Sequence, residues 1–227
     1  MEKMNKKILA IIPARGNSKS IRDKNLVKIN GKSLIQHVFE TLKKSKKIDE
    51  IYCSTDSQKI INHCKKIGLD FEIRAKKFSR DNSNISDYLL YILKKKIFDI
   101  IILAQPTSPF INDKQIDNMI NKIQKNNFNS AQTISKVLHN NHFLNQRTFI
   151  NSKVSFKFEK ERLKKYNKQK KPESYKFGNM IIFKRKKFLQ TKNVFCKPSY
   201  GLLIDFLSSI DIDTKQDLII ARKLFKR

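Results

Sequence analysis

The sequence predicts an α/β fold, a mostly parallel β-sheet with helices on both faces. Short continuous apolar runs, which are typical of strands buried on both faces, occur at residues 8–12 and 99–104. Segments with apolar residues at helical spacing alternate with these and further strand-like runs. Because strands that alternate with helices form a parallel sheet, we expect the ligand beyond the carboxyl ends of the strands.

The elements follow from local signals taken in chain order. Pro13 ends the first apolar run, and an Asn30-Gly31 turn precedes a segment with helical spacing. Asp56 is expected to cap the next helix and Gly68 to end it. Strands are predicted at residues 8–12, 51–54, 71–73, 99–104 and 180–183. Helices are predicted at residues 33–45, 57–67 and 86–95, from Asn112 or Asp113 to 123, and at 214–225.

Residues 139–176 differ from the rest of the chain. They are rich in Asn and Lys, with only a weak alternation of apolar and polar residues at 153–158. We therefore predict that they form a small β-rich arm or lid outside the main sheet. The predicted α/β domain then consists of residues 1–138 and 177–227.

Composition limits the classes of function. The chain has 227 residues, with 49 Lys and Arg against 20 Asp and Glu, a formal charge of +29. The lysines are scattered and no aromatic RNA-binding motif accompanies them, which favours solvated lysine faces or a polyphosphate substrate over nucleic acid. No apolar run approaches the roughly 20 residues that span a bilayer, and no signal peptide is expected. Three widely spaced cysteines indicate neither disulfides nor zinc, so we expect a cytoplasmic protein without a membrane partner.

The loop at residues 13–25, after the first strand, is a candidate phosphate site. Arg15, Lys19 and Lys24 supply cations, and Gly16 permits an open backbone whose N–H groups are expected to be free to face a phosphate. A triphosphate requires several such donors directed at one place. The alternative is a basic surface loop.

Two aspartates near the carboxyl end are candidate metal ligands. In an extended segment at 210–214, Asp211 and Asp213 share one face, because alternate side chains point the same way. Mg²⁺ takes one or two carboxylates together with phosphate oxygens. The alternative is that one aspartate caps the last helix and the other is solvated. Gln105 lies in a loop stiffened by two prolines and is a candidate for an amide contact with a sugar or base.

Together these motifs resemble those of the bacterial acylneuraminate cytidylyltransferases, or CMP-sialic acid synthetases. The resemblance covers almost the whole chain, from Ile8 to about Phe225. The segments that carry it are residues 12–19, 24–26, 54–56, 105–109 and 209–214. The related Kdo cytidylyltransferases have a shorter first loop, so the chain is more similar to the branch that acts on nonulosonic acids.

The resemblance implies a nucleotide-diphospho-sugar transferase-like fold, a homodimer joined through the arm, and Mg²⁺ as cofactor. It implies transfer of CMP from CTP to a nine-carbon, sialic-type 2-keto sugar acid, with release of pyrophosphate. The cations of the first loop and the carboxylate pair must then face each other across one cavity. The roles implied by motif are catalysis for Arg15, Lys24 and Asp213; nucleotide binding for Ala14, Arg15, Lys19, Asn25, Arg74 and Ser83; sugar binding for Gln105; and metal binding for Asp211 and Asp213.

The chain departs from the family pattern at four positions, one of which is Lys168 in the arm, where the family has an arginine. Ile111 replaces an arginine that the family often has, Gly178 replaces an asparagine, and Ile85 replaces a hydroxyl residue. These positions concern sugar and nucleotide contacts more than phosphate and metal contacts. The alternatives are a cytidylyltransferase for Kdo or an amino-octulosonate, a homologue that binds nucleotide without catalysis and, in another class, a basic RNA-binding protein.

Overall fold

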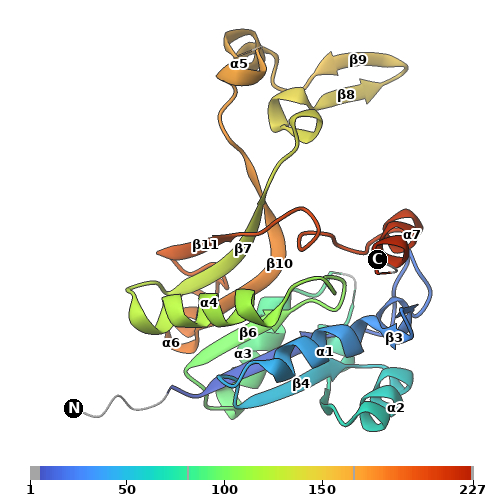
Figure 1. The fold of residues 1–227 in the computed structure, drawn as a ribbon, viewed down its shortest axis with the longest axis vertical. Helices are drawn as coiled ribbons and strands as arrows, with labels where there is room; N and C mark the ends of the chain where they lie inside the picture. Colours follow the sequence, from blue (N-terminus) through green and yellow to red (C-terminus); the bar gives the residue numbers. More distant parts are fainter. Residues whose placement is uncertain (1–5, 81, 166, 226–227) are drawn as a thin grey trace.

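The computed structural model describes residues 6–80, 82–165 and 167–225. Across these residues, seven strands form one sheet in the order β11-β7-β10-β6-β1-β4-β5, in which β10 runs antiparallel to its neighbours (Figure 1). The strands of this sheet are β1 (Ile8–Pro13), β4 (Glu50–Thr55), β5 (Asp70–Ile73), β6 (Ile100–Ala104), β7 (Ser130–Lys136), β10 (Tyr175–Lys184) and β11 (Ser199–Leu203). The prediction of a mostly parallel α/β sheet is confirmed.

Helices cover both faces of the sheet, because successive residues of a strand point to opposite sides. Ile8, Ala10 and Ile12 of β1 pack into the core on one side, and Leu9 and Ile11 pack into the core on the other. The helices on the first side are α1 (Leu34–Lys44), α2 (Gln58–Ile67) and α4 (Asp113–Lys125). Those on the second side are α3 (Ile85–Lys95) and α6 (Arg185–Thr191).

Local signals set the ends of several helices. The Ser33 hydroxyl accepts the backbone N–H of Gln36 at the start of α1. Asn112 and Gln115 form a reciprocal capping box at the start of α4. Gly68 ends α2 with a φ of 66°, a left-handed conformation that glycine adopts without steric cost. Because these residues can be recognised in the sequence, the predicted boundaries of the helices lie close to the observed ones.

Two strands of the sheet, β7 and β11, and the short helix α6 were not predicted from the sequence. The buried side chains of β7 include Ser130, Thr133 and Ser135, so no apolar run marks this strand. β10 is also longer than the predicted strand at 180–183, because it continues out of the sheet domain toward the arm.

The arm projects from the sheet domain where β7 leaves and β10 returns (Figure 1). In it, β8 (Arg147–Ile150) and β9 (Lys153–Phe156) form a hairpin, beside α5 (Glu159–Lys164) and short 3-10 turns. The buried anchor of the arm is small. It includes Leu144 and the imidazole of His142, whose Nε2 lies 2.9 Å from the carbonyl oxygen of Pro172.

The last helix, α7 (Lys215–Leu224), packs over the loop that follows β1. Leu218 and Ala221 of α7, together with Ile212, form a buried cluster with Ile21 and Leu34. The small hairpin of β2 (Lys28–Ile29) and β3 (Lys32–Ser33) adds a further apolar residue to it. This cluster brings the carboxyl-terminal segment beside the amino-terminal loop.

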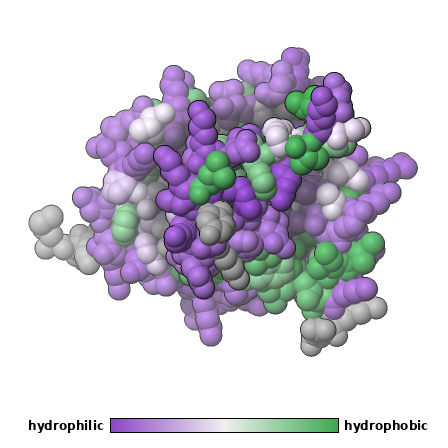
Figure 2. Space-filling view, turned by 90° about the horizontal axis from the view of Figure 1, so that it is seen from above, coloured by the Kyte–Doolittle hydropathy of each residue, from purple (hydrophilic) through white to green (hydrophobic). Residues whose placement is uncertain are grey.

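The surface seen from above, looking onto the arm, is predominantly hydrophilic with separate hydrophobic groups (Figure 2). Among the described residues, no helix combines the length and apolar character needed to cross a membrane.

Candidate active site

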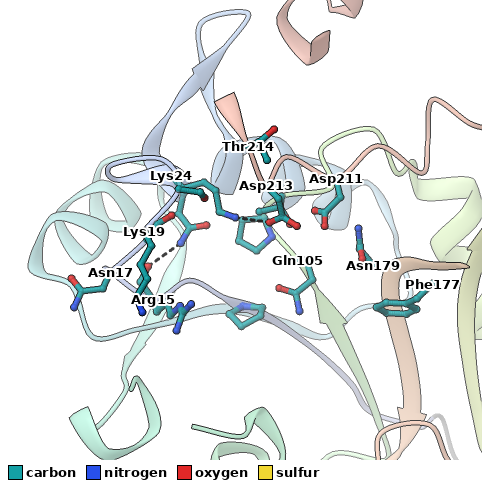
Figure 3. A pocket seen from close by; sticks show the side chains of 16 residues that line it. Arg15, Asn17, Lys19, Lys24, Gln105, Phe177, Asn179, Asp211, Asp213 and Thr214 are labelled. Atoms are coloured by element: carbon teal, nitrogen blue, oxygen red, sulfur yellow. Dashed lines mark hydrogen bonds and ion pairs between the residues drawn. The ribbon is translucent and has the colours of Figure 1, made fainter. Parts of the chain in front are cut away.

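A cavity of about 620 Å³ lies at the carboxyl ends of β1 and β6, where a parallel sheet is expected to bind its ligand (Figure 3). Its walls are the basic loop after β1, the loop after β6, the end of β10, and the segment before α7. The predicted site residues that line it are Arg15, Lys19, Lys24, Asn25, Gln105, Asp211 and Asp213.

Lys24 and Asp213 face each other in this cavity. Nζ of Lys24 lies 2.8 Å from Oδ1 of Asp213, although the two residues are 189 positions apart. The side chain of Lys24 is 15% exposed and that of Asp213 is 66% exposed. The hydrogen bond from the Lys24 ammonium is the main reason that the pKa of Asp213 is lowered from its usual value. The basic loop and the carboxylate pair therefore lie in contact, as expected.

Asp211 is the more buried carboxylate of the pair. Burial is the largest effect on the Asp211 carboxyl, and together with the neighbouring charge of Asp213 it raises the pKa. Its Oδ1 is buried, with no hydrogen-bond partner in the described part of the chain. Ile212, between the two aspartates, is fully buried, and its N–H donates to the Thr107 carbonyl at 2.9 Å. This anchor holds both carboxylates at the cavity wall.

The carboxylate pair fits a divalent cation. A buried carboxylate oxygen without a partner, beside a second carboxylate, is unfavourable unless a positive charge compensates it. No cluster of three His, Cys, Asp or Glu side chains that could enclose a metal occurs within the described ranges. A cation held by Asp211 and Asp213 would therefore take its other ligands from phosphate and water, which is the coordination that Mg²⁺ favours.

Hydrogen bonds within the basic loop and to the segment after β4 fix its conformation. Nδ2 of Asn25 donates to the carbonyl of Arg15 at 3.0 Å. The N–H of Gly16 donates to Oδ1 of Asp56 at 2.8 Å. The N–H of Gly16 is therefore not free for a phosphate, unlike what was expected of the loop. The expectation that Asp56 caps α2 is wrong, because the residue at the N-cap is Ser57 and no side chain caps this helix. A Cβ at position 16 would lie 2.7 Å from Cβ of Ser57, so glycine is required there for close approach rather than for an unusual φ.

A second cavity of about 330 Å³ adjoins the first and shares Pro13, Arg15 and Gln105 with it. Arg74 and Ser83 line this cavity and not the first. Apart from Ala14, which lines neither, the predicted nucleotide-binding residues are thus divided between two adjoining spaces.

Arg74 is a buried cation held by β4 and α3. Its side chain is 6% exposed, and its Nε donates to Oγ of Ser54 at 3.0 Å. Its guanidinium carbon lies 4.7 Å from the centre of the Tyr88 ring. Burial lowers the pKa of the Arg74 guanidinium. The hydroxyl of Tyr88 in turn donates to Glu72 at 2.7 Å, so a connected set of polar groups orients this arginine.

Ala14 and the positions at which the chain departs from the family pattern differ in their burial. Ala14 is fully buried in the core, and its N–H donates to the Ser54 carbonyl at 2.9 Å. Ile111 is also a core residue, whereas Ile85 lines the second cavity. Gly178 is buried against Thr133. The departures from the family pattern therefore include two packing positions, 111 and 178.

Phe177 and Asn179 of β10 line the first cavity, and neither was predicted as a site residue from the sequence. Asn179 has a φ of 67°, and the pairing of β10 with β7 shifts register between Phe177 and Ile181. Asparagine tolerates the left-handed conformation better than most residues, so the Gly178-Asn179 pair was the available signal.

Fold and site together define a class of protein. A mostly parallel α/β sheet that gathers cations and a carboxylate pair at the carboxyl ends of its strands is suited to bind a nucleoside triphosphate and transfer part of it, as nucleotidyltransferases do. The chain belongs to the cytidylyltransferase family, whose model matches residues 9–224.

Individual relatives agree with this family. The chain is 27% identical to the N-acylneuraminate cytidylyltransferase of Escherichia coli over 96% of its own length and 52% of that protein, so it spans about half of that relative. It is 29% identical to the CMP-N,N'-diacetyllegionaminic acid synthase of Legionella pneumophila over 97% of both chains. A solved CMP:2-keto-3-deoxy-manno-octonic acid synthetase, complexed with CTP, has the same fold, with a TM-score of 0.71, 17% identity and coverage of 97% of this chain and 98% of that one.

Proposed function

We propose that this chain transfers CMP from CTP to a sialic-type nonulosonic acid and releases pyrophosphate. The observation that carries the proposal is the contact between Lys24 and Asp213, with Asp211 beside them, in a cavity at the carboxyl ends of the strands. The names of the relatives from Escherichia coli and Legionella pneumophila support a nine-carbon sugar acid. Because CTP is an intracellular nucleotide, we propose that the reaction takes place in the cytoplasm.

The two connected cavities support an assignment of substrates. We assign the nucleoside of CTP to the smaller cavity, beside Arg74 and Ser83, and the sugar acid to the larger one, beside Gln105. The α-phosphate then lies at their junction, where Arg15 lines both spaces and Lys24 lines the larger one. Further nucleotide contacts are assigned to Lys19, Asn25 and the backbone of Ala14.

The proposed reaction is a displacement at the α-phosphorus. The anomeric hydroxyl oxygen of the sugar acid bonds to this phosphorus while its bond to the oxygen that bridges to the β-phosphate breaks. Pyrophosphate leaves with the bonding electron pair, and the hydroxyl proton is lost to solvent. Catalysis of such a step depends on positioning and on stabilisation of charge, which Arg15 and Lys24 would supply at the α-phosphate.

We propose Mg²⁺ as the cofactor, held by Asp211 and Asp213. The buried, unpartnered Oδ1 of Asp211 within the described residues and its neighbour Asp213 supply two carboxylates for it. When bound, Mg²⁺ would neutralise negative charge on the phosphates during the transfer.

We also propose that the arm joins two copies of the chain. Phe149 and Val154, cross-strand partners of the arm hairpin, are 73% and 60% exposed. Apolar side chains exposed together on a small element are typical of a protein interface. A second copy that covers them would give the homodimer implied by the resemblance.

Pyrophosphate release measured with CTP, Mg²⁺ and a panel of sugar acids tests the proposed activity. We expect turnover with sialic, legionaminic or pseudaminic acid, and none when ATP replaces CTP. Turnover with Kdo alone would assign the chain to the octulosonate branch. A protein that binds CTP and turns over no member of the panel would contradict the proposal.

A further inference from the structure

A third cavity, of about 680 Å³, adjoins the basic loop as well. It shares Asn17, Ser18 and Lys19 of the loop with the first cavity, and it shares Ser79 and Arg80 with the second. The loop at residues 13–25 therefore borders all three spaces, since Pro13 and Arg15 line the second. The proposed function assigns no substrate group to this third one.

The walls of the third cavity carry an excess of positive charge. Lys19, Arg22 and Arg80 line it, and Asp23 is the only carboxylate among its lining residues in the described part of the chain. Asp23 is paired outside the loop, because Nζ of Lys59 lies 2.8 Å from its Oδ2. An anion that enters this cavity thus meets the guanidinium groups of Arg22 and Arg80, beside a carboxylate whose charge is already compensated.

Ser79 adds a hydroxyl at the boundary between the second and third cavities. Its Oγ is buried, and within residues 6–80, 82–165 and 167–225 it has no hydrogen-bond partner. A buried hydroxyl without a partner is uncommon, since burial of a polar group costs free energy unless a hydrogen bond replaces water. A phosphate oxygen at this boundary would accept its hydrogen bond.

The geometry of displacement at phosphorus gives this cavity a role. The attacking and leaving oxygens lie roughly in line, on opposite sides of the phosphorus. The first cavity takes the attacking sugar acid, so the leaving group requires a separate space that also borders the loop. We propose that the third cavity binds the β- and γ-phosphates of CTP and holds the departing pyrophosphate, with Arg22 and Arg80 as its cations and Ser79 as a hydroxyl donor. This inference rests on the proposed function.

The charges in this cavity would act on the leaving group. As the bond to the α-phosphorus breaks, negative charge grows on the oxygen that remains with pyrophosphate. Guanidinium groups form strong, charge-assisted hydrogen bonds to phosphate oxygens and bind two of them at once. Arg22 and Arg80 would therefore strengthen the binding of CTP and of pyrophosphate more than that of CMP, which lacks both outer phosphates.

The double variant Arg22→Gln with Arg80→Gln tests the inference. Calorimetry in the presence of Mg²⁺, without sugar acid, measures the dissociation constants of CTP, CMP and pyrophosphate. We expect about tenfold weaker binding of CTP and pyrophosphate for each arginine removed, and a clearly smaller loss for CMP, because only Arg80 also lines the nucleoside cavity. The control is Lys186→Gln with Lys187→Gln, two exposed residues of α6 outside the three cavities, which removes the same net charge.

The outcomes separate the inference from the proposed function. If the unaltered protein binds neither CTP nor CMP, the proposed function fails and the inference fails with it. If the unaltered protein binds both and the arginine variant still binds CTP and pyrophosphate normally, only the inference is overturned. Equal losses for CTP and CMP, or equal losses in the lysine control, also overturn it, because they indicate a general effect of charge. Both arginines are exposed, so circular dichroism is expected to show an unchanged fold.

Discussion

The sheet domain and the arm bury their side chains to very different extents. The five residues from Ile8 to Ile12 of β1 are fully buried, and helices cover both faces of the strand. In the arm hairpin, Phe149 is 73% exposed and Val154 is 60% exposed. The sheet domain contains its own apolar core, whereas the arm presents apolar side chains that its own fold leaves uncovered.

This difference in burial separates catalysis, in the sheet domain, from assembly, through the arm, under the proposed function. The cavities lie in the sheet domain, at the ends of strands that the core holds rigidly. The arm is carried by β7 and β10 and packs little of its surface on itself. A change at the cavity should therefore affect chemistry and leave assembly intact, and a change on the arm should affect assembly first.

Asp213→Asn gives the largest expected effect, and it is confined to the sheet domain. The substitution keeps the shape of the side chain but removes the charge that faces Lys24 and, under the proposed function, binds the cation. We expect kcat to fall by about 10³-fold or more in a pyrophosphate-release assay. Asp113→Asn, in the first turn of α4, is the matched control. Normal turnover by Asp213→Asn, with an unchanged elution volume, would show that this carboxylate has no part in the reaction.

Phe149→Glu with Val154→Glu tests the other side of the comparison. These residues are cross-strand partners in the hairpin, so both charges would lie on one face. A charge buried in an interface without a partner is strongly unfavourable, and we expect the dimer to dissociate at least about 100-fold more readily. Light scattering coupled to size-exclusion chromatography measures the change.

The neighbouring pair supplies the control for this experiment. Thr148 and Ser155 are also cross-strand partners, and they lie on the opposite face of the hairpin. Thr148→Glu with Ser155→Glu adds the same charge and should leave the dimer intact. An unaltered chain that is monomeric at micromolar concentration, or a dimer that survives Phe149→Glu with Val154→Glu, would show that this face is not the interface.

The same contrast explains how far the sequence predicts the fold. Apolar runs such as residues 8–12 and caps such as Asn112 identify elements of the sheet domain from the sequence. In these elements neighbouring residues are buried together or form local hydrogen bonds, so a short stretch of sequence carries the signal. β7 was missed because its buried residues include Ser130 and Thr133. An apolar pattern cannot identify a strand that is buried through small polar side chains.

Site residues were predictable where they belong to a motif within one segment. They were not predictable where tertiary packing alone determines which side chains line a cavity. Lys24 and Asp213 were expected to meet, and they do. Phe177 enters the cavity through an irregularity in β10, which sequence spacing does not show. Arg22 and Arg80 are two of 49 cations, and only the folded loop shows that they share a cavity.

Gly178→Ala acts at the junction of the two regions, on β10. A Cβ at this position would lie 2.7 Å from Oγ1 and 2.9 Å from Cβ of Thr133, a stiff β-branched side chain. We expect a loss of about 1–3 kcal/mol in the free energy of unfolding, measured with urea. The control is Gly201→Ala on β11, whose Cβ would meet the flexible end of Ile134 at 3.0 Å. Equal stability of the two variants would show that Thr133 can move aside.

The smallest expected effect is a pH dependence of stability that arises from His63, in the sheet domain. The hydroxyl of Ser33 lies 2.7 Å from Nε2 of His63 and also caps α1, so it can donate to the neutral imidazole. Burial, and then the charges of Lys66 and Lys28, lower the pKa of His63 below 6.5. The unfolded chain therefore takes up a proton near pH 6.5 that the folded chain resists, and this contribution to stability is present above that pH and lost below it.

We expect His63 to account for a decrease in Tm of less than about 2 °C between pH 7.5 and 5.5, since the side chain is half-buried and solvent screens the charges. His63→Gln keeps an acceptor for Ser33 but does not titrate, so its Tm should vary less with pH over this range. Because His63 lies in the sheet domain, the difference between the two proteins should be the same in the background of Phe149→Glu with Val154→Glu. A difference that disappears when the arm interface is disrupted would place the titrating group at the interface and contradict the separation of the two regions.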